Sequence, residues 1–377
     1  MSKANVTDAE AFAAEAKGVR TRLLLELEQS SSVSQLAEFQ VHLKDEIIRA
    51  ESNRGAGRHH LEVKEHLFRL RLLGDSLAWR LLHRHAIRNL AKNDGRPPRL
   101  SDRRHEIENC MAAVRWLSTE GISAICTDLT HCLRIGDVII VRHPEIPEIL
   151  EFKARVRDDR YRHQGRAGRQ LHRMEKTIEY LSRGAAQFRD ESIARMSLEI
   201  DLRAKHDFLQ VGSVAATALR DGASTEMLRP RQWLGACRLG CEPIAPAEAR
   251  QFTDLRLCIG SLADALPNLL HEVPPPLNWP ISLDLRRALM EGELVLFHIV
   301  DPRLLETERI RRVLFDRRGN GAFEVDAGGN TFQCSDYFLR QLLYGFQTPD
   351  SVAETMNALA LKTSELGILP TASRTRT

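Results

Sequence analysis

The sequence predicts a mixed α/β protein with a helical N-terminal section, an α/β core and a smaller α+β section toward the C-terminus. Three observations predict this class: helical apolar spacing through residues 8–90, short β-branched runs within 122–154, and glycine-rich turns between apolar runs after residue 280. The chain has 377 residues, which is more than one hydrophobic core usually organises. Its 43% hydrophobic and 28% charged residues are typical of a folded globular protein.

The first section, residues 1–95, is predicted to be helical because its apolar residues recur at three- and four-residue spacing. Thr7 and Glu10 form a capping-box pattern at the start of the first helix, and a polar break at 29–34 separates this helix from the second. A leucine-rich stripe then predicts a further long helix. Residues 93–101 contain a glycine and two prolines, so they mark the first section boundary.

The second section, residues 100–200, is predicted to contain a helix, three strands and another helix, in that order. The first helix covers 106–120, where apolar residues again have helical spacing, and Gly121 ends it. β-branched runs and a proline-containing turn predict the strands. The three strands and the second helix are predicted at 122–131, 137–141, 148–154 and 168–188.

The third section, residues 201–377, has a weaker pattern and is predicted to be a smaller α/β region. A proline-rich break at 272–280 is a candidate boundary within it. The sequences DRRGNG and DAGGN predict turns between later apolar runs. The predicted elements are a helix at 207–219, a strand at 227–239 and a strand at 293–299.

Three residues beside the predicted strands could carry chemistry: Asp137, Glu151 and Lys153. Alternation along a strand places Glu151 and Lys153 on the same face. If the strands flanking the RHPEIP turn pair, Asp137 approaches Glu151, and we expect all three side chains to share one cleft. Two carboxylates are hard oxygen ligands that suit Mg²⁺, and the lysine can stabilise charge at a phosphate. The alternative is structural: Asp137 caps a turn, and the other two form an ion pair.

This pattern resembles the PD-(D/E)XK, or restriction-endonuclease-like, superfamily, whose core is a helix, a hairpin with Asp, a strand with Glu-x-Lys and another helix. The resemblance covers only the second section. It implies that Asp137 and Glu151 bind Mg²⁺ or Mn²⁺ and that Lys153 is the catalytic lysine. Superfamily members carry an acidic residue on the first helix, for which Glu106 and Glu108 are the candidates. The proline of the superfamily motif is missing before the aspartate.

A basic stretch after Glu-x-Lys indicates a nucleic-acid partner, because arginine suits phosphate recognition. A helix beginning near residue 168 would also present backbone N–H groups to an anion. The alternative is a solvated basic loop, and the net charge of +3 is too small to decide between them. Gln170 lies on the helix where some superfamily members carry a glutamine. The expected nucleic-acid contacts are Arg155, Arg157, Arg166, Arg169 and Gln170.

We therefore predict a metal-dependent phosphodiesterase, a nuclease for which DNA is favoured over RNA. Bacterial defence proteins often join such a core to unfamiliar domains, so the resemblance suggests a role in phage defence or restriction. Two alternatives stay open: a catalytically inactive nucleic-acid-binding or regulatory protein that retains the fold, and a helical scaffold in a larger assembly. The candidate protein partners are a second copy of the chain and another protein of a defence system. The sequence contains no Walker A loop or dinucleotide-binding glycine pattern.

Other sequence patterns argue against a membrane span and a disulfide framework. The longest apolar runs are far shorter than the roughly 18 residues that cross a bilayer, so no span is expected. The N-terminus lacks the pattern of a secretory signal, so a cytoplasmic location is expected. The seven cysteines are scattered, as free thiols in a reducing compartment would be, and only Cys237 and Cys241 lie close in sequence.

Overall fold

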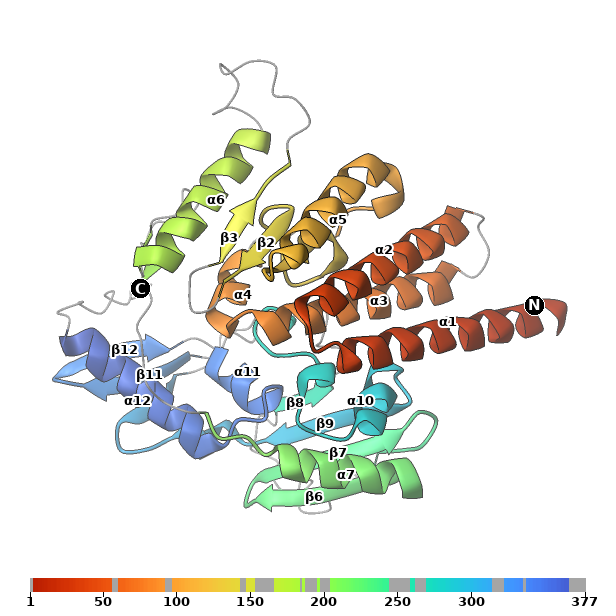
Figure 1. The fold of residues 1–377 in the computed structure, drawn as a ribbon. Coiled ribbons are helices and arrows are strands. Elements are labelled where there is room, and N and C mark those ends of the chain that lie inside the picture. The colour runs from red at the N-terminus through yellow and green to blue at the C-terminus, as the bar shows by residue number, and fades with distance from the viewer. Residues whose placement is uncertain are drawn as a thin grey trace. The chain divides into compact units, whose positions relative to one another are not determined.

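The fold is mixed α/β, as predicted, with N-terminal helices and several small antiparallel sheets (Figure 1). Contacts divide the chain into two compact units, one of residues 1–197 and 267–278 and the other of 198–266 and 279–377. The predicted helical section and α/β core therefore belong to one unit. The computed structural model describes residues 3–55, 60–91, 97–142, 147–152, 166–183, 185–186, 195–196, 204–243, 258–261, 269–313, 322–334 and 337–365.

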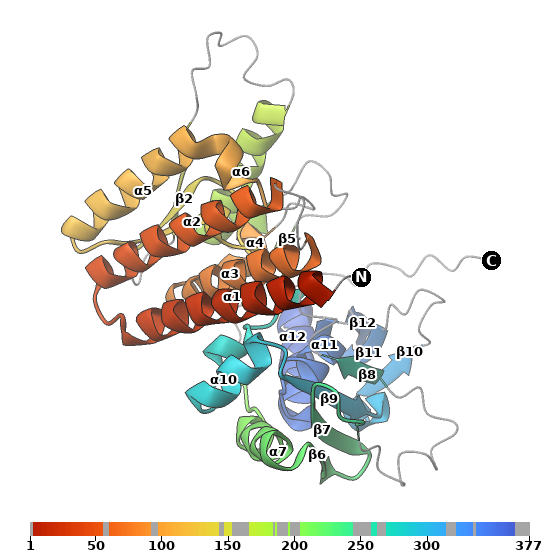
Figure 2. The same cartoon turned by 90° about the vertical axis from the view of Figure 1, so that its right-hand side faces the viewer.

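The first unit begins with helices that pack through their apolar faces. Figure 2 shows the first three of them side by side, and α3 contacts both α1 and α2. Leu23, Leu43, Ile47 and Leu70 are fully buried, as expected from their spacing. The helical prediction for this section is confirmed. These helices are α1 Lys3–Gln29, α2 Val33–Gly55, α3 His60–Leu81 and α4 Arg84–Leu90.

A three-stranded antiparallel sheet, in the order β1-β2-β3, follows in the same unit. Its strands are shorter than predicted: the strand expected to run to His131 ends at Cys126 because a 3-10 turn starts at Thr127. Gly121, with φ 73°, follows α5 as predicted. The elements are η1 Leu100–Arg103, α5 Arg104–Thr119, β1 Ser123–Cys126, η2 Thr127–Leu129, β2 Val138–Val141, β3 Glu148–Leu150, α6 Arg166–Arg183, and the ribbon β4 Ala185–Ala186 and β5 Arg195–Met196.

The outer edge of this sheet is closed by a side chain. Gln40 of α2 is buried, and its Nε2 donates to the Ala124 carbonyl at 2.9 Å. Its Oε1 accepts from the Cys126 N–H, also at 2.9 Å. The amide of Gln40 thus replaces the peptide of a missing neighbouring strand and satisfies two buried backbone groups of β1.

A buried carboxylate connects α3 to the loop that leads into β2. Asp75 is fully buried, and its Oδ1 accepts from the backbone N–H groups of His131 at 2.6 Å and Cys132 at 2.7 Å. The preceding Gly74 lets the loop approach the helix, since a Cβ there would lie 2.2 Å from the Leu129 carbonyl oxygen. This contact holds the loop between β1 and β2 against the helical section.

The second unit contains a four-stranded antiparallel sheet in the order β6-β7-β9-β8. The single strand predicted at 227–239 is wrong, because the chain turns at Pro230 and Arg231 and forms the β6–β7 hairpin. Proline cannot donate to a sheet ladder, and Arg231 has φ 68°, a value that strands do not contain. The strand predicted at 293–299 is confirmed. The elements are α7 Phe208–Asp221, β6 Ala223–Arg229, β7 Gln232–Arg238, β8 Cys258–Ser261, η4 Pro276–Asn278 (in the first unit), α10 Leu283–Met290 and β9 Leu294–Val300.

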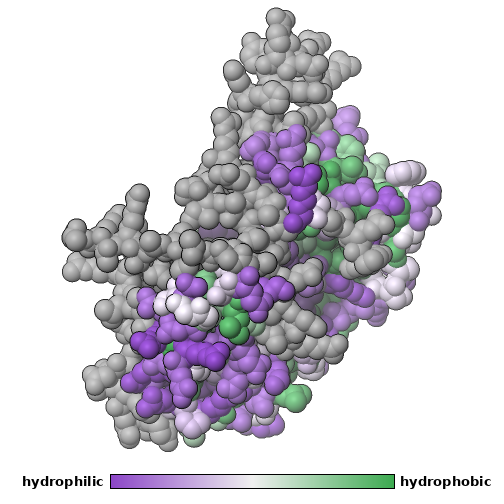
Figure 3. Space-filling view, turned by 90° about the vertical axis from the view of Figure 1, so that its left-hand side faces the viewer, coloured by the Kyte–Doolittle hydropathy of each residue, from purple (hydrophilic) through white to green (hydrophobic). Residues whose placement is uncertain are grey.

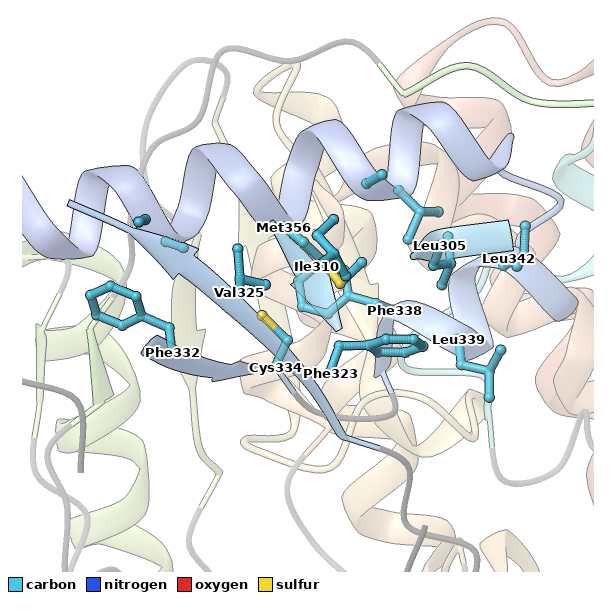
Figure 4. Close-up of a cluster of buried hydrophobic side chains, with 14 of the residues drawn as sticks. Leu305, Ile310, Phe323, Val325, Phe332, Cys334, Phe338, Leu339, Leu342 and Met356 are labelled. Carbon is cyan, nitrogen blue, oxygen red and sulfur yellow. The ribbon is translucent and has the colours of Figure 1, made fainter. Parts of the chain in front are cut away.

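A smaller sheet completes the second unit, with α12 packed across it (Figure 4). Phe323 and Val325 of the central strand are fully buried against Met356 of that helix. The DAGGN turn is confirmed, since Gly328 and Gly329 have positive φ between two paired strands; the DRRGNG sequence lies outside the described residues. The elements are η5 Pro302–Leu305, β10 Ile310–Val313, β11 Ala322–Ala327, β12 Asn330–Cys334, α11 Tyr337–Leu343 and α12 Pro349–Glu365.

A chain of hydrogen bonds crosses the interior of the second unit and ends at a neutral histidine. The Arg229 guanidinium donates to both oxygens of Asp207, at 2.7 and 2.8 Å, and to Oε1 of Gln232 at 2.8 Å. The amide of Gln232 then presents Nε2 to Nε2 of the buried His298 at 3.0 Å. Because the Leu343 carbonyl can only accept, Nδ1 of His298 donates to it, at 3.1 Å, and Nε2 accepts from Gln232.

This network makes the stability of the protein sensitive to acid. Burial lowers the pKa of His298 from 6.5 to about 4. The unfolded chain therefore binds the proton first as pH falls, and up to about 3 kcal/mol of stability should be lost between pH 6.5 and about 4. Chemical denaturation at several pH values gives the free energy of unfolding as a function of pH. Its slope between pH 6.5 and about 4 should be smaller for His298→Gln than for the wild type. The control is His105→Gln, because His105 is exposed. If the free energy of unfolding has the same pH dependence in all three proteins, His298 is not the group that makes the protein sensitive to acid.

Candidate functional site

Asp137 lies immediately before β2, at the end of the β2–β3 hairpin. Its backbone N–H donates to the Leu150 carbonyl at 2.8 Å, and its Oδ2 accepts from the Phe152 N–H at 2.6 Å. Only 8% of the residue is exposed. These two hydrogen bonds tie Asp137 to the strand that leads into Glu-x-Lys and orient its carboxylate.

The hairpin register places Glu151 opposite Asp137. Val138 pairs with Leu150, so the next position outward on each strand is Asp137 on one side and Glu151 on the other. Glu151 is half-buried and engaged in an interaction of its own. The two predicted carboxylates therefore come from the same end of the same hairpin.

The other predicted residues are placed only in part. Lys153, Arg155 and Arg157 lie outside the described residues, so the expected convergence with Lys153 stays a prediction. Arg166, Arg169 and Gln170 lie on the first turns of α6, where the structure describes the backbone and not these side chains.

The two acidic candidates on α5 have different partners. Glu106 bonds to Arg103, one turn before it, and its negative charge also acts on Asp137. Glu108 is largely exposed and instead accepts from Nζ of Lys44 on α2 at 2.6 Å. Of the two, Glu106 is the one that the structure brings toward Asp137.

Two residues that the sequence analysis did not single out complete the cluster: Arg103 and Asp128. Nη1 of Arg103 lies 3.2 Å from Oδ2 of Asp128, and its Nη2 lies 4.0 Å from Oδ1 of Asp137. The register explains why Asp128 is close, because Cys126 at the end of β1 pairs with Val138 at the start of β2. An acidic residue just after the first strand of an antiparallel pair was the sequence signal available for it.

Burial sets the electrostatics of these carboxylates. Desolvation raises the pKa of Asp137, although the Phe152 N–H and Arg103 oppose this effect. Desolvation also raises the pKa of Asp128, and the negative charge of Asp137 adds to the increase. For Arg103, burial lowers the pKa, but Asp128, Glu106 and Asp137 together outweigh it and the net pKa is raised. Negative charge is thus concentrated where the solvent screens it poorly, as is common at functional sites.

The carboxylates at this end of the hairpin are of the chemical type that binds a divalent metal ion. Asp137 and Glu151 supply hard oxygen ligands, and Oδ1 of Asp137 already faces a cationic group. Within the described parts of the chain, no group of three His, Cys, Asp or Glu side chains could hold a metal ion. Mg²⁺ commonly uses one or two carboxylates and completes its shell with water and substrate phosphate, so a pair is sufficient for it.

Comparison with known protein families, curated proteins and solved structures finds no match for this chain. No helix in the described ranges is long and apolar enough to cross a membrane. On the face seen in Figure 3, hydrophobic residues of the described part are interspersed with many hydrophilic ones.

Proposed function

We propose that this chain is a metal-dependent phosphodiesterase that cleaves nucleic acid, with DNA favoured over RNA. The observation that supports the proposal is the hairpin register, which puts the backbone positions of Asp137 and Glu151 opposite each other, together with the Arg103 contacts that link Asp137 to Glu106 and Asp128. The chain order α5, β1 to β3 and α6 is compatible with the helix, strands and helix that the resemblance implies. Phage defence or restriction is the proposed setting, on the resemblance alone.

Each of the three predicted residues has a distinct role in this proposal. Asp137 and Glu151 would hold Mg²⁺ or Mn²⁺, and the Phe152 N–H keeps the Asp137 carboxylate in a fixed orientation. When bound, the metal supplies an activated water and stabilises negative charge at the scissile phosphate. Lys153 is a point charge for that same phosphate, which should matter most as charge develops in the transition state.

The test is nuclease activity on linear duplex, circular duplex and single-stranded DNA, and on RNA, with Mg²⁺ or Mn²⁺ and with a chelator. We expect cleavage that needs the metal and is lost in Glu151→Gln. The matched control is Glu148→Gln, since Glu148 lies on β3, three residues before Glu151, but is exposed and pairs with Arg142. Equal activity of both variants, or none in the wild type with any substrate, would refute the proposal.

The alternative function is nucleic-acid binding without cleavage. The observation that favours it is the position of Arg103, whose positive charge already lies against the cluster. Salt-sensitive binding of DNA by a wild-type protein that cleaves no substrate would support this alternative.

The basic start of α6 should contribute to binding under either function. Replacing Arg166 and Arg169 together by alanine is expected to flatten the salt dependence of log K, by about 0.9 for each lost contact with a duplex phosphate. Fluorescence anisotropy at several salt concentrations measures the slope. Arg220→Ala is the control. Arg220 lies on a different helix, α7, where it is exposed and paired with the neighbouring Asp221. A slope identical to that of the wild type would show that the basic residues of α6 are merely solvated.

A further inference from the structure

Arg103 lies among carboxylates from three different elements. It bonds to Glu106 of α5, lies 3.2 Å from Asp128 of η2, and lies 4.0 Å from Asp137 before β2. Asp128 also experiences the charges of Arg71 and Arg134, but neither of these is among the groups that act on Asp137. The guanidinium of Arg103 is therefore the cation that faces the Asp137 end of the cluster in the described structure.

The two oxygens of Asp137 have different surroundings. Oδ2 accepts the Phe152 N–H at 2.6 Å, which uses one of its lone pairs. Oδ1 is the oxygen that faces Nη2 of Arg103. A metal ion that used Oδ1 as its ligand would approach the side of the carboxylate on which Nη2 of Arg103 lies.

The side chain of Arg103 is partly exposed to solvent. It lies at the junction of η1 and α5, where φ is −126° and ψ is 34°, and it makes no capping hydrogen bond to the helix. Its side chain is 37% exposed, whereas that of Arg71 is 7% exposed. A long side chain at a partly exposed position can move its charged group from the carboxylates into the solvent, so that the charge is not left buried.

We infer that Arg103 is a built-in competitor for the metal site: its guanidinium stands in for the metal ion beside Asp137 and must move aside before the metal binds. This inference rests on the proposed function, because it concerns the same site. Arg103 thereby regulates the site, because it lowers the affinity for the metal ion in the free protein. The carboxylates stay neutralised and the fold stays stable while no metal is present.

The test is Mn²⁺ binding without nucleic acid, measured by isothermal titration calorimetry and by the metal-induced shift in melting temperature. Arg103→Gln is expected to bind Mn²⁺ roughly tenfold more tightly than the wild type, since the competing cation is gone. Its melting temperature without metal should fall, because the carboxylates lose their counter-charge, and should recover when Mn²⁺ is added. Arg103→Lys keeps the positive charge but loses the planar guanidinium group. Its affinity for Mn²⁺ should therefore lie between those of the wild type and Arg103→Gln.

The matched control is Arg104→Gln, which removes the same charge one residue along, from an exposed side chain. It should bind Mn²⁺ as the wild type does. If Arg103→Gln and Arg103→Lys bind Mn²⁺ no more tightly than the wild type, the competitor role is overturned while the metal site stands. If none of the proteins binds Mn²⁺, the metal site and the proposed function fail as well.

Discussion

Asp137→Asn is expected to lower metal-dependent cleavage by at least about a thousandfold while leaving the fold intact. Asparagine has nearly the same shape, and its side-chain oxygen can still accept the Phe152 N–H that fixes the hairpin end. It has no negative charge with which to hold a divalent ion, so Mn²⁺ should no longer shift the melting temperature. Cleavage rates and metal-induced shifts, measured on the same preparations, separate loss of chemistry from loss of structure.

The melting temperature without metal provides a second readout for this variant. Because burial raises the pKa of Asp137, its charge is costly in the free protein, and the neutral asparagine should be at least as stable as the wild type. Asp102→Asn is the control, since Asp102 is exposed in the same η1 segment. An Asp137→Asn protein that cleaves at the wild-type rate would show that Asp137 only caps the hairpin.

Asp75→Ala should be the most destabilising substitution considered, with a loss of about 3–5 kcal/mol. The change leaves the N–H groups of the half-buried His131 and the buried Cys132 without their acceptor and removes the carboxylate from beside the half-buried Arg134. Urea denaturation should show a lower midpoint. Asp75→Asn should lose less, because its oxygen can still accept both N–H groups.

Asp102→Ala serves as the control for this substitution too, because an exposed aspartate should change stability by no more than about 0.5 kcal/mol. The same urea titration applies to all of the variants. If Asp75→Ala unfolds at the wild-type midpoint, the contact between α3 and the loop before β2 adds nothing to stability.

The sequence by itself determined the elements whose signals are local. Apolar spacing determined the N-terminal helices and α5, and the β-branched run 138–141 determined β2, because these patterns depend on residues within a few positions of one another. The pairing of the strands next to Asp137 and Glu151 also followed from the sequence, since two strands joined by a short turn pair in a restricted register. Pro230 was an available signal for the β6–β7 turn, and we interpreted that segment as one strand.

Only the tertiary structure decided which distant groups meet. Gln40 completes the edge of β1 from 84 residues away in sequence, and Asp75 holds a loop 56 residues further along. Arg103 reaches Asp128 and Asp137 because α5 packs on the sheet at one angle and depth, which depends on the sum of many side-chain contacts. Local sequence patterns do not encode this packing. The position of Arg103 beside Asp137 is therefore visible only in the tertiary structure.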